Sequence, residues 1–166
     1  MKSIHRFLQE VESSVKIVRG DLNNKEDFKA ASQLLLQLWE HHDKITKYKP
    51  ESSSSLQLAQ GTIKDEMKYN PYPLFLKDGD KHVGFILALN WKRDSKMVGN
   101  INHLYMRDEY RGKGVGLKLI NMSVKHLKSV GCNVMRVGVT AGNEKVIALY
   151  KKAGFGVESY SLRQDK

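Results

Sequence analysis

Residues 104–116 read Leu104-Tyr105-Met106-Arg107-Asp108-Glu109-Tyr110-Arg111-Gly112-Lys113-Gly114-Val115-Gly116, in which a strand pattern gives way to a glycine-rich turn and then to a helix pattern. Glycines in such a turn let backbone N–H groups point into one concavity, and the helix N-terminus adds a positive field, so both favour a phosphate group. Spacing excludes a Walker loop, which needs Gly-Lys followed by Ser or Thr, and a dinucleotide fingerprint, which needs G-x-G-x-x-G. Taken alone, the stretch predicts either a phosphate-binding turn or a glycine-rich connector without a ligand.

Hydrophobic patterns on both sides of this turn alternate between the strand period and the helix period. They predict strands over 15–18, 72–77, 82–91, 98–106, 134–139 and 155–162, and helices over about 24–42, 56–67, 115–130 and 143–153. Asn24 and Asn143 stand where helix N-caps are expected, and Asp78-Gly79 suits the turn of a hairpin. Strands interleaved with helices predict an α/β (α+β) domain around a mixed sheet, with residues 1–166 as a single domain.

An additional helix is predicted in residues 1–14, because Ile4, Phe7, Leu8 and Val11 recur at the spacing of one helix face. This face would pack on the domain or on a second subunit, so a homodimer is one interpretation. The segment contains scattered charges and no continuous apolar stretch, and it is therefore not expected to be a signal peptide. Since no stretch of the chain is long and apolar enough to span a membrane, a cytoplasmic location follows by default.

The composition narrows the classes of function. Hydrophobic residues make up 40% and charged residues 28% of the 166 residues, which is typical of a globular domain. The net charge of +10 attracts polyanions, including a phosphate-rich cofactor. The basic residues are spread along the chain without the spacing of a known nucleic-acid motif, so nucleic acid is not expected. Cys132 is the only cysteine, which excludes an intrachain disulfide and a four-cysteine zinc site, and no metal is predicted.

Two motifs in sequence order resemble the GNAT superfamily of acetyl-CoA-dependent N-acetyltransferases. Arg111-x-x-Gly114-x-Gly116 is similar to the family's (Q/R)-x-x-G-x-(G/A) motif, and residues 104–106 stand where the family's fourth strand ends. Residues 143–155, Asn-Glu-Lys-Val-Ile-Ala-Leu-Tyr-Lys-Lys-Ala-Gly-Phe, are similar to the family's N-x-x-A-x-x-x-Y-x-x-x-G-F segment. The resemblance covers residues 98 to about 162 in detail, while the earlier elements agree only in order and length.

The resemblance implies a splayed central sheet flanked by helices, with acetyl-CoA in the gap between the fourth and fifth strands. The N–H groups from Arg111 to Gly116 would bind the pyrophosphate, and the N–H of Met106 would bind the thioester carbonyl. Asn143 and Tyr150 are two helical turns apart and share a helix face that can look toward the pantetheine arm. The residues expected to bind the cofactor are thus Leu104, Met106, Arg111, Gly112, Lys113, Gly114, Val115, Gly116, Asn143 and Tyr150.

Acetyl transfer to an amine requires a neutral nitrogen, a polarised carbonyl and a protonated leaving thiolate. Met106 would stabilise the oxyanion through its backbone N–H, and the phenol of Tyr150 would protonate the sulfur. The alternative for Tyr150 is a core tyrosine whose hydroxyl is bonded elsewhere. The expected reaction is direct attack of the amine on acetyl-CoA in a ternary complex, without an acetyl-enzyme intermediate.

The base that takes the amine proton is not evident from the sequence. Enzymes of the family often carry Glu or His on the fourth strand, whereas counting back in twos from Met106 gives Leu104, Asn102 and Asn100. Asparagine can orient an amine but cannot accept its proton. His103 has the right chemistry but the opposite parity, unless a bulge turns it round. The remaining candidates for the acceptor side are His41 and His42 at the end of the first long helix, and a water chain is equally admissible.

The acceptor is expected to be a primary amine of a small molecule or a protein. Five acidic residues fall in the region that would line the acceptor cleft, which favours a cationic acceptor: Glu40, Asp43, Glu51, Asp65 and Glu66. The alternative is a CoA-binding or interaction module of the same fold without catalysis, against which the intact Tyr150 argues. A basic nucleic-acid binder ranks third, and its binding would weaken steeply with salt.

Overall fold

The structure is a computed structural model and describes residues 15–47 and 53–164. The helix predicted in residues 1–14 lies outside the described residues. Five strands form one sheet in the order β1-β2-β3-β4-β5, which is also their order along the chain. Neighbouring strands from β1 to β4 are antiparallel, and β5 is parallel to β4. Their bounds are β1 Val15–Arg19, β2 Tyr72–Asp78, β3 Lys81–Arg93, β4 Lys96–Met106 and β5 Val134–Val137.

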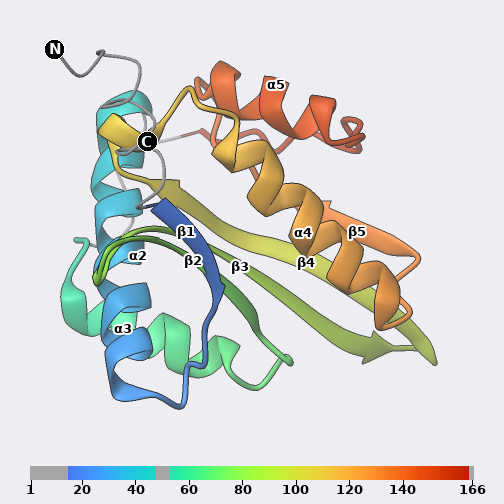
Figure 1. Cartoon of the computed structure of the whole chain (residues 1–166). Coiled ribbons are helices and arrows are strands. Elements are labelled where there is room, and N and C mark those ends of the chain that lie inside the picture. The colour runs from blue at the N-terminus through green and yellow to red at the C-terminus, as the bar shows by residue number, and fades with distance from the viewer. Residues whose placement is uncertain (1–14, 48–52, 165–166) are drawn as a thin grey trace, which may run out of the picture.

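Helices cover both faces of the sheet (Figure 1). One face carries α2 (Lys25–Ile45) and α3 (Leu56–Glu66), and the other carries α4 (Val115–Ser129) and α5 (Glu144–Lys152). Helix α2 begins at the predicted cap Asn24 and α3 begins at Ser55, and both side chains accept hydrogen bonds from backbone N–H groups of the first turn. Within the described part of the chain, no helix combines the length and apolarity that a bilayer crossing requires.

Strand β3 runs through the middle of the core, as its apolar sequence predicts. Phe85, Leu87 and Leu89 pack against α2 and α3, while Ile86 and Ala88 pack in the second cluster with residues of α4. Successive side chains of a strand point to opposite faces, so an apolar residue at every position is needed when both faces are covered. The central sheet is therefore rigid, and the elements at its edges can carry the functional groups.

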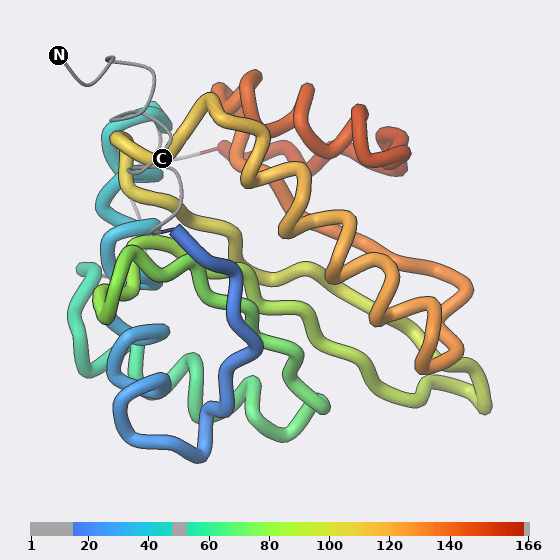
Figure 2. The backbone as a smooth tube through the Cα atoms, in the orientation of Figure 1, coloured from blue at the N-terminus to red at the C-terminus, as the bar shows by residue number. Residues whose placement is uncertain are grey.

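Strand β4 has 11 residues and its neighbour β5 only 4 (Figure 1). Figure 2 traces the path of the chain through both segments. The pairing joins Val98–Ile101 to Val134–Val137 and goes no further. Residues 102–106 of β4 therefore have no strand partner on the β5 side among the residues that the structure describes. This unpaired part of β4 lies where the resemblance implies a gap between the fourth and fifth strands, and it ends just before the glycine-rich turn that precedes α4.

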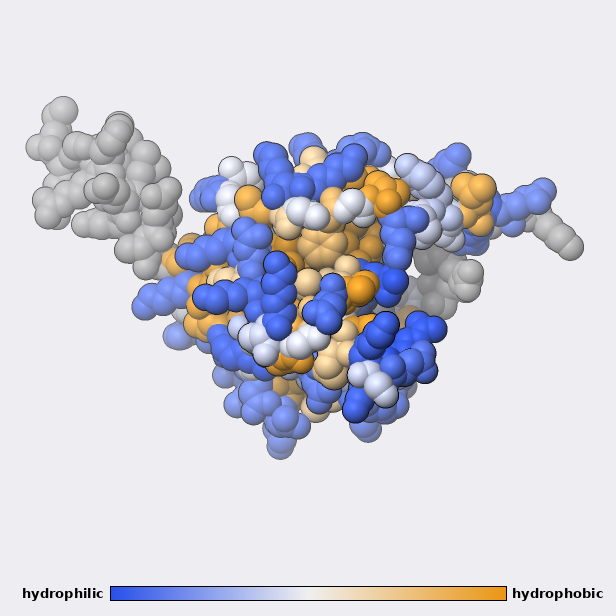
Figure 3. All heavy atoms as spheres, turned by 90° about the vertical axis from the view of Figure 1, so that its right-hand side faces the viewer, coloured by the Kyte–Doolittle hydropathy of each residue, from blue (hydrophilic) through white to orange (hydrophobic). Residues whose placement is uncertain are grey.

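The predicted last strand, residues 155–162, is absent, and that prediction is wrong. Residues 153–164 follow α5 without regular structure, although Arg136 of β5 forms a bidentate ion pair with Glu158 at 2.7 and 2.9 Å. The alternating side chains of this segment do not enter a core, since Tyr160 is 85% and Leu162 94% exposed. A strand needs a buried face as well as an edge to pair with, and here only Phe155 packs on the body. Figure 3 shows apolar side chains gathered in the middle of the side that carries α5 and β5.

The first prediction concerns the contribution of the N-cap residue Asn24 to the stability of the protein. Asn24 accepts hydrogen bonds from Glu26 N at 2.8 Å and from Asp27 N at 3.3 Å. Asn24→Ala should lower the free energy of unfolding by about 1 kcal/mol, because two N–H groups lose their acceptor. Urea unfolding measures this change, and Asn133→Ala at an exposed loop position is the control. Equal stability of both variants would contradict a capping role for Asn24.

Candidate active site

The glycine-rich turn ends at the N-terminus of α4, where Gly114 is the N-cap residue with φ +77° and ψ −3°. No side chain caps this helix and no acidic residue lies in its first turn. The N–H groups of the first turn are therefore open to an anion, and the helix field favours one. A side chain added at Gly114 would meet no atom within 4 Å, so the left-handed backbone rather than lack of space requires glycine there.

Gly116 is required for a different reason. A Cβ at this position would lie 3.0 Å from Leu149 of α5 and 3.1 Å from the end of the Met106 side chain. The missing side chain lets α4 approach both α5 and the end of β4. The start of α4, just after the glycine-rich turn, therefore packs directly against the strand end on one side and against α5, the helix of Tyr150, on the other.

Met106 ends β4 with its backbone directed into the gap. The N–H of the next residue, Arg107, donates to Val83 O of β3 at 3.0 Å. Backbone directions alternate along a strand, so the N–H and C=O of Met106 point away from β3 and toward the unpaired side. The same alternation places the N–H of Leu104 on that side. Among the described residues no strand pairs with this side of β4 at Met106, so its N–H is a free donor at the strand end.

Arg111 anchors the turn to the strand end instead of extending toward solvent. Its Nε donates to Met106 O at 2.8 Å, and its Nη1 lies 2.8 Å from an Asp108 carboxylate oxygen. Its backbone N–H donates to Asp108 O at 3.1 Å. A pyrophosphate bound by this N–H would have to replace or share its bond to Asp108 O, and the place of the Arg111 N–H in the pyrophosphate-binding set stays a prediction. The exposed stretch that remains is Gly112-Lys113-Gly114, followed by the first turn of α4, which includes Val115 and Gly116.

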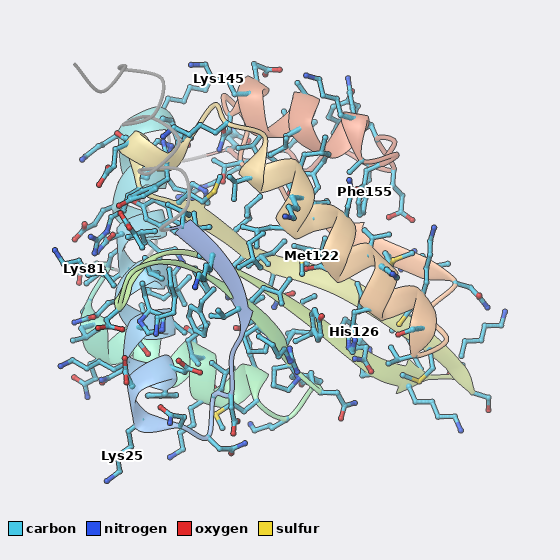
Figure 4. All side chains as sticks on the ribbon, viewed as in Figure 1. Lys25, Lys81, Met122, His126, Lys145 and Phe155 are labelled. Atoms are coloured by element: carbon cyan, nitrogen blue, oxygen red, sulfur yellow. The ribbon has the colours of Figure 1, made fainter. Side chains whose placement is uncertain are left out.

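Tyr150 lies in the apolar cluster between the sheet, α4 and α5, together with Leu104, Met106 and Leu149. Its side chain is only 5% exposed, and Phe155 packs edge-on against its ring at 5.5 Å, between α5 and β5 in Figure 4. Burial raises the pKa of the Tyr150 phenol far above its usual range, because the phenolate would lose its solvation. The structure thus brings Tyr150 and Met106 into one cluster and keeps the phenol protonated.

Asn143 stands at the N-cap of α5, as the sequence predicts, but it does not cap the helix with its side chain. Its carbonyl accepts from the N–H groups of Val146 and Ile147, which continue the helix ladder. The side-chain amide has no capping partner, because ψ is +59° and the cap geometry is not extended. This amide remains available to a ligand, two helical turns before Tyr150.

The predicted placement of Asn100 and Asn102 on the face of Leu104 and Met106 is wrong. The register of β4 against β3 shifts so that Leu87 pairs with His103 and Ala88 with Ile101, which leaves Asn102 as an inserted residue. Such a bulge reverses the parity of every residue before it. Both asparagines therefore lie on the face of α2 and α3, where Asn102 donates to Glu66 at 2.8 Å and Asn100 donates to Asn102.

His103 lies on this same face and is paired with Glu66, the last residue of α3. Its Nε2 is 2.8 and 2.9 Å from the two carboxylate oxygens of Glu66. The two side chains are only 11% and 12% exposed. Sequence reasoning counted Glu66 among acidic residues of the cleft and set His103 aside by parity. His103 lies on this face by regular alternation with Tyr105, and the packing of α3 brings Glu66 to it. The bulge adds Asn102 to the pair, and neither feature has a local signal in the sequence.

His41 and His42 lie at the same end of the molecule, in the last part of α2. Burial lowers the pKa of His41, and the positive charge of Arg111 lowers it further. Burial also lowers the pKa of His42, with smaller contributions from His41 and His103. Because Arg111 and His103 act on these pKa values, the end of α2 lies near both the glycine-rich turn and the Glu66–His103 pair. Both imidazoles are predominantly neutral at pH 7, since a lowered pKa moves further below 7.

A shallow groove runs along α4, starting at the glycine-rich turn. It begins at Gly114 and includes the outer side of Met122, which Figure 4 labels. Two lysines give it positive charge, and its lining residues are Gly114, Leu117, Lys118, Asn121, Met122 and Lys125. Among the described residues, no group of three or more potential metal ligands of the His, Cys, Asp and Glu types occurs. The polar chemistry of this end of the molecule is therefore that of backbone donors, histidines and Glu66.

A mixed five-stranded sheet with helices on both faces, and with a glycine-rich turn at a helix N-terminus after β4, is an α/β domain with the fold of known acetyltransferases. The model of the acetyltransferase (GNAT) family matches residues 34–155. The chain belongs to this family.

Relatives with similar sequences are acetyltransferases with different acceptors in their names. A mycothiol acetyltransferase from Corynebacterium efficiens is 36% identical over 94 residues, which are 56% of this chain and 30% of that protein. An L-methionine sulfoximine/L-methionine sulfone acetyltransferase from Pseudomonas aeruginosa is 29% identical over 76 residues, which are 45% of this chain and 44% of that protein. The matched stretch thus spans less than half of each of these relatives.

Solved structures share the fold over nearly the whole chain. The aminoglycoside N-acetyltransferase AAC(6')-Iy in complex with CoA has a TM-score of 0.67 at 16% identity and covers 92% of this chain and 94% of its own. A putative acetyl transferase from Pyrococcus furiosus has a TM-score of 0.71 at 14% identity and covers 92% of this chain and 99% of its own. These similarities concern the fold.

The left-handed turn generates the second prediction. Gly114→Val should weaken acetyl-CoA binding by about tenfold or more, because the strain of a β-branched residue at positive φ, about 1–2 kcal/mol, must be relieved by moving the turn. Calorimetric titration with acetyl-CoA measures the affinity, and a melting curve shows whether the fold survives. The control is Gly61→Val, which adds the same side chain in α3 where no atom lies within 4 Å. If Gly114→Val binds as tightly as the parent, the phosphate site lies elsewhere.

Proposed function

We propose that this protein transfers the acetyl group of acetyl-CoA to a primary amine by direct attack in a ternary complex. The observation that carries the proposal is the free N–H of Met106 at the unpaired end of β4, adjoining the open N-terminus of α4. A thioester carbonyl and a pyrophosphate both accept hydrogen bonds from backbone N–H groups of these two kinds. Membership of the acetyltransferase family and the acetyltransferase names of the relatives support the same chemistry.

The cofactor would be bound mainly by backbone. The pyrophosphate accepts hydrogen bonds from the N–H groups of residues 112–116, and the pantetheine arm enters the gap between β4 and β5. Leu104 and the Asn143 amide are the groups proposed to contact this arm. The exposed Lys113 and the lysines of the α4 groove would attract the remaining phosphate of CoA. A site of this kind depends on glycine more than on charged side chains, which agrees with the uncapped Gly114.

The reaction would proceed through a tetrahedral intermediate. The amine nitrogen forms a bond to the acetyl carbon while the carbonyl oxygen becomes an oxyanion, which Met106 N–H stabilises. The carbon–sulfur bond then breaks, and the thiolate takes the proton of the Tyr150 phenol. A raised pKa suits this acid, because the phenol holds its proton until a strongly basic thiolate forms beside it. The tyrosine recovers its proton from solvent after CoA departs.

The acceptor would enter from the side of α2 and α3, where His41 and His42 lie near the end of β4. Fewer acidic side chains are available there than the sequence predicts. Asp65 is paired with Lys68 at 2.9 Å, Glu66 is occupied by His103, and Glu51 lies outside the described residues. Glu40 and Asp43 are exposed on α2 and give a weaker attraction for a cationic amine. A small-molecule amine is favoured by the acceptors in the relatives' names, with a protein amine as the alternative.

The third prediction separates the acid from the binding residues. Tyr150→Phe should lower kcat by about a hundredfold or more, the usual contribution of a positioned general acid, while acetyl-CoA affinity changes little. Release of CoA measured against a panel of primary amines gives kcat, and calorimetry gives the affinity. Tyr160→Phe, at a tyrosine that is 85% exposed, is the control. An unchanged kcat in a folded Tyr150→Phe variant would leave the solvent or the acceptor as the acid. Binding of CoA without acetyl transfer to any amine would instead indicate a binding module.

A further inference from the structure

We infer that the guanidinium of Arg111 binds the carboxylate of the acceptor, so that the acceptor is an amino acid which receives the acetyl group on its α-amine. The inference rests on the proposed function and names the class of amine on which it acts. It is drawn from the position of one cation at the end of β4, directly beside the backbone group proposed to stabilise the oxyanion.

The guanidinium of Arg111 lies next to the proposed oxyanion donor. Its Nε donates to Met106 O at 2.8 Å, and the N–H of the same residue is the proposed donor to the thioester carbonyl. In an extended strand the N–H and C=O of one residue point to the same side and lie about 3 Å apart. With the 2.8 Å hydrogen bond added, the guanidinium begins within roughly 6 Å of the Met106 amide nitrogen.

The guanidinium also has donors left for a ligand. An arginine side chain carries five N–H donors in one plane. Nε donates to Met106 O, and Nη1 lies 2.8 Å from a carboxylate oxygen of Asp108. Nothing in the described part of the chain accepts a hydrogen bond from Nη2, and the side chain is 35% exposed. The N–H groups of Nη2 are therefore accessible, and a carboxylate is the acceptor that matches them best in charge and shape.

Asp108 does not prevent this binding. Its side chain is 84% exposed, whereas that of Arg111 is 35% exposed. The attraction between an arginine and a carboxylate that faces water is weak and is screened by salt. Asp108 can turn into solvent at small cost, so the pair leaves the guanidinium able to bind a second carboxylate on its more enclosed side.

The groups around the guanidinium place it on the acceptor side. Arg111 Cζ lies 5.4 Å from the centre of the Tyr105 ring, and Tyr105 packs against the cluster under α2 and α3. Burial raises the pKa of the Tyr105 phenol, so the phenol keeps its proton and can donate to an anion. The positive charge of Arg111 also acts on His41, near the end of α2 (Figure 1). The guanidinium thus reaches the face from which the acceptor would enter.

An amine without a carboxylate would meet an unfavourable charge at this position. Its ammonium form would be repelled by a guanidinium a few ångströms from the acetyl group. The acidic side chains of α3 do not compensate, because Asp65 is paired with Lys68 and Glu66 with His103. An amino acid carries no net charge at neutral pH, so its carboxylate can bind Arg111 while its amine points toward the carbonyl.

The spacing favours an amine on the carbon next to the carboxylate. The nitrogen of an α-amino acid lies about 3 Å from its carboxylate oxygens. A hydrogen bond of about 2.8 Å then places this nitrogen roughly 6 Å from the guanidinium, the same range as the Met106 amide. The nitrogen bonds to the acetyl carbon, the carbon–sulfur bond breaks, and the products are the N-acetyl amino acid, CoA and one proton released to solvent. A terminal amine on a longer chain, as in 6-aminohexanoate, would extend past the carbonyl.

The experiment measures CoA release with the common L-amino acids, each beside its own primary amide, and with 6-aminohexanoate. At least one amino acid should be acetylated, and 6-aminohexanoate should be a poor acceptor. Arg111→Gln keeps a donor for Met106 O and removes the cation, and glutamine is one of the two residues in the family motif at this position. It should lower the ratio of kcat/KM for the acid to kcat/KM for the amide by about tenfold to a hundredfold, mainly through KM.

The ratio cancels any effect of the substitution on acetyl-CoA and the difference in reactivity between the two amines. Arg107→Gln is the matched control, because it removes the same charge from the same segment and also lies near the Tyr105 phenol. Its ratio should stay near that of the parent. An equal fall for acid and amide in Arg111→Gln overturns the inference. So does a parent that acetylates other amines but no amino acid, or that uses 6-aminohexanoate as well as an α-amino acid.

Binding of the products gives a test that needs no turnover. At saturating CoA, millimolar N-acetyl-L-alanine should raise the Tm of the parent more than N-acetyl-L-alaninamide does, because a ligand bound only to the folded state stabilises it. Tyr105→Phe, which removes one donor and keeps the ring, should narrow this difference. Equal shifts for acid and amide in the parent overturn the inference. A parent that binds acetyl-CoA and acetylates no amine would instead overturn the proposed function, so the two failures can be told apart.

Discussion

The site depends on the end of β4, which extends beyond its parallel neighbour β5. In the interior of a sheet, the N–H and C=O groups of a strand form hydrogen bonds with both neighbouring strands. After Ile101, β4 has a strand neighbour on one side only among the described residues. Its last residue, Met106, then has a backbone donor that points into an opening beside a helix N-terminus. Backbone groups are positioned by the whole sheet and do not need a rotamer to be fixed. Because Gly116 has no side chain, Met106 at the strand end and Leu149 of α5 pack closely over the start of α4, where an added Cβ would lie 3.1 and 3.0 Å from them.

Near the end of β4, one face of the sheet carries apolar residues and the other face carries a network of polar residues. Leu104, Met106 and Tyr150 belong to the cluster under α4 and α5, which offers an apolar environment for the thioester and a protonated phenol. The opposite face, under α2 and α3, carries the polar network around Glu66 and His103. A one-residue bulge at Asn102 makes this division possible, because it changes the parity of β4 between its paired first half and its open second half. The acyl donor and the acceptor would therefore approach the same carbonyl from opposite faces of the sheet.

Much of the fold follows from local signals in the sequence. The capped helices α2 and α3, the hairpin at Asp78-Gly79 and the helices after the glycine-rich turn lie where periodicity and cap residues predict them. The strand over 155–162 fails because alternation alone does not supply a face to bury. The glycine-rich turn before α4 could be predicted because it is continuous in sequence and needs glycine for its positive φ. Its binding of a phosphate stays a prediction. The Glu66–His103 pair could not, since its partners are 37 residues apart and meet only because α3 packs against the sheet, for which the sequence carries no local signal.

Hydrogen exchange at the amide of Met106 tests the central claim most directly. The adjacent amide, Arg107, is an internal control because it already donates to Val83 O. In the free protein the Met106 amide should exchange much faster than that of Arg107, and saturating acetyl-CoA should slow its exchange by about tenfold or more, since an opening that breaks a new hydrogen bond must precede exchange. Arg107 should change little beyond the general stabilisation by the ligand. A Met106 amide that is already protected without acetyl-CoA, or that keeps its fast exchange when acetyl-CoA is bound, would contradict the account.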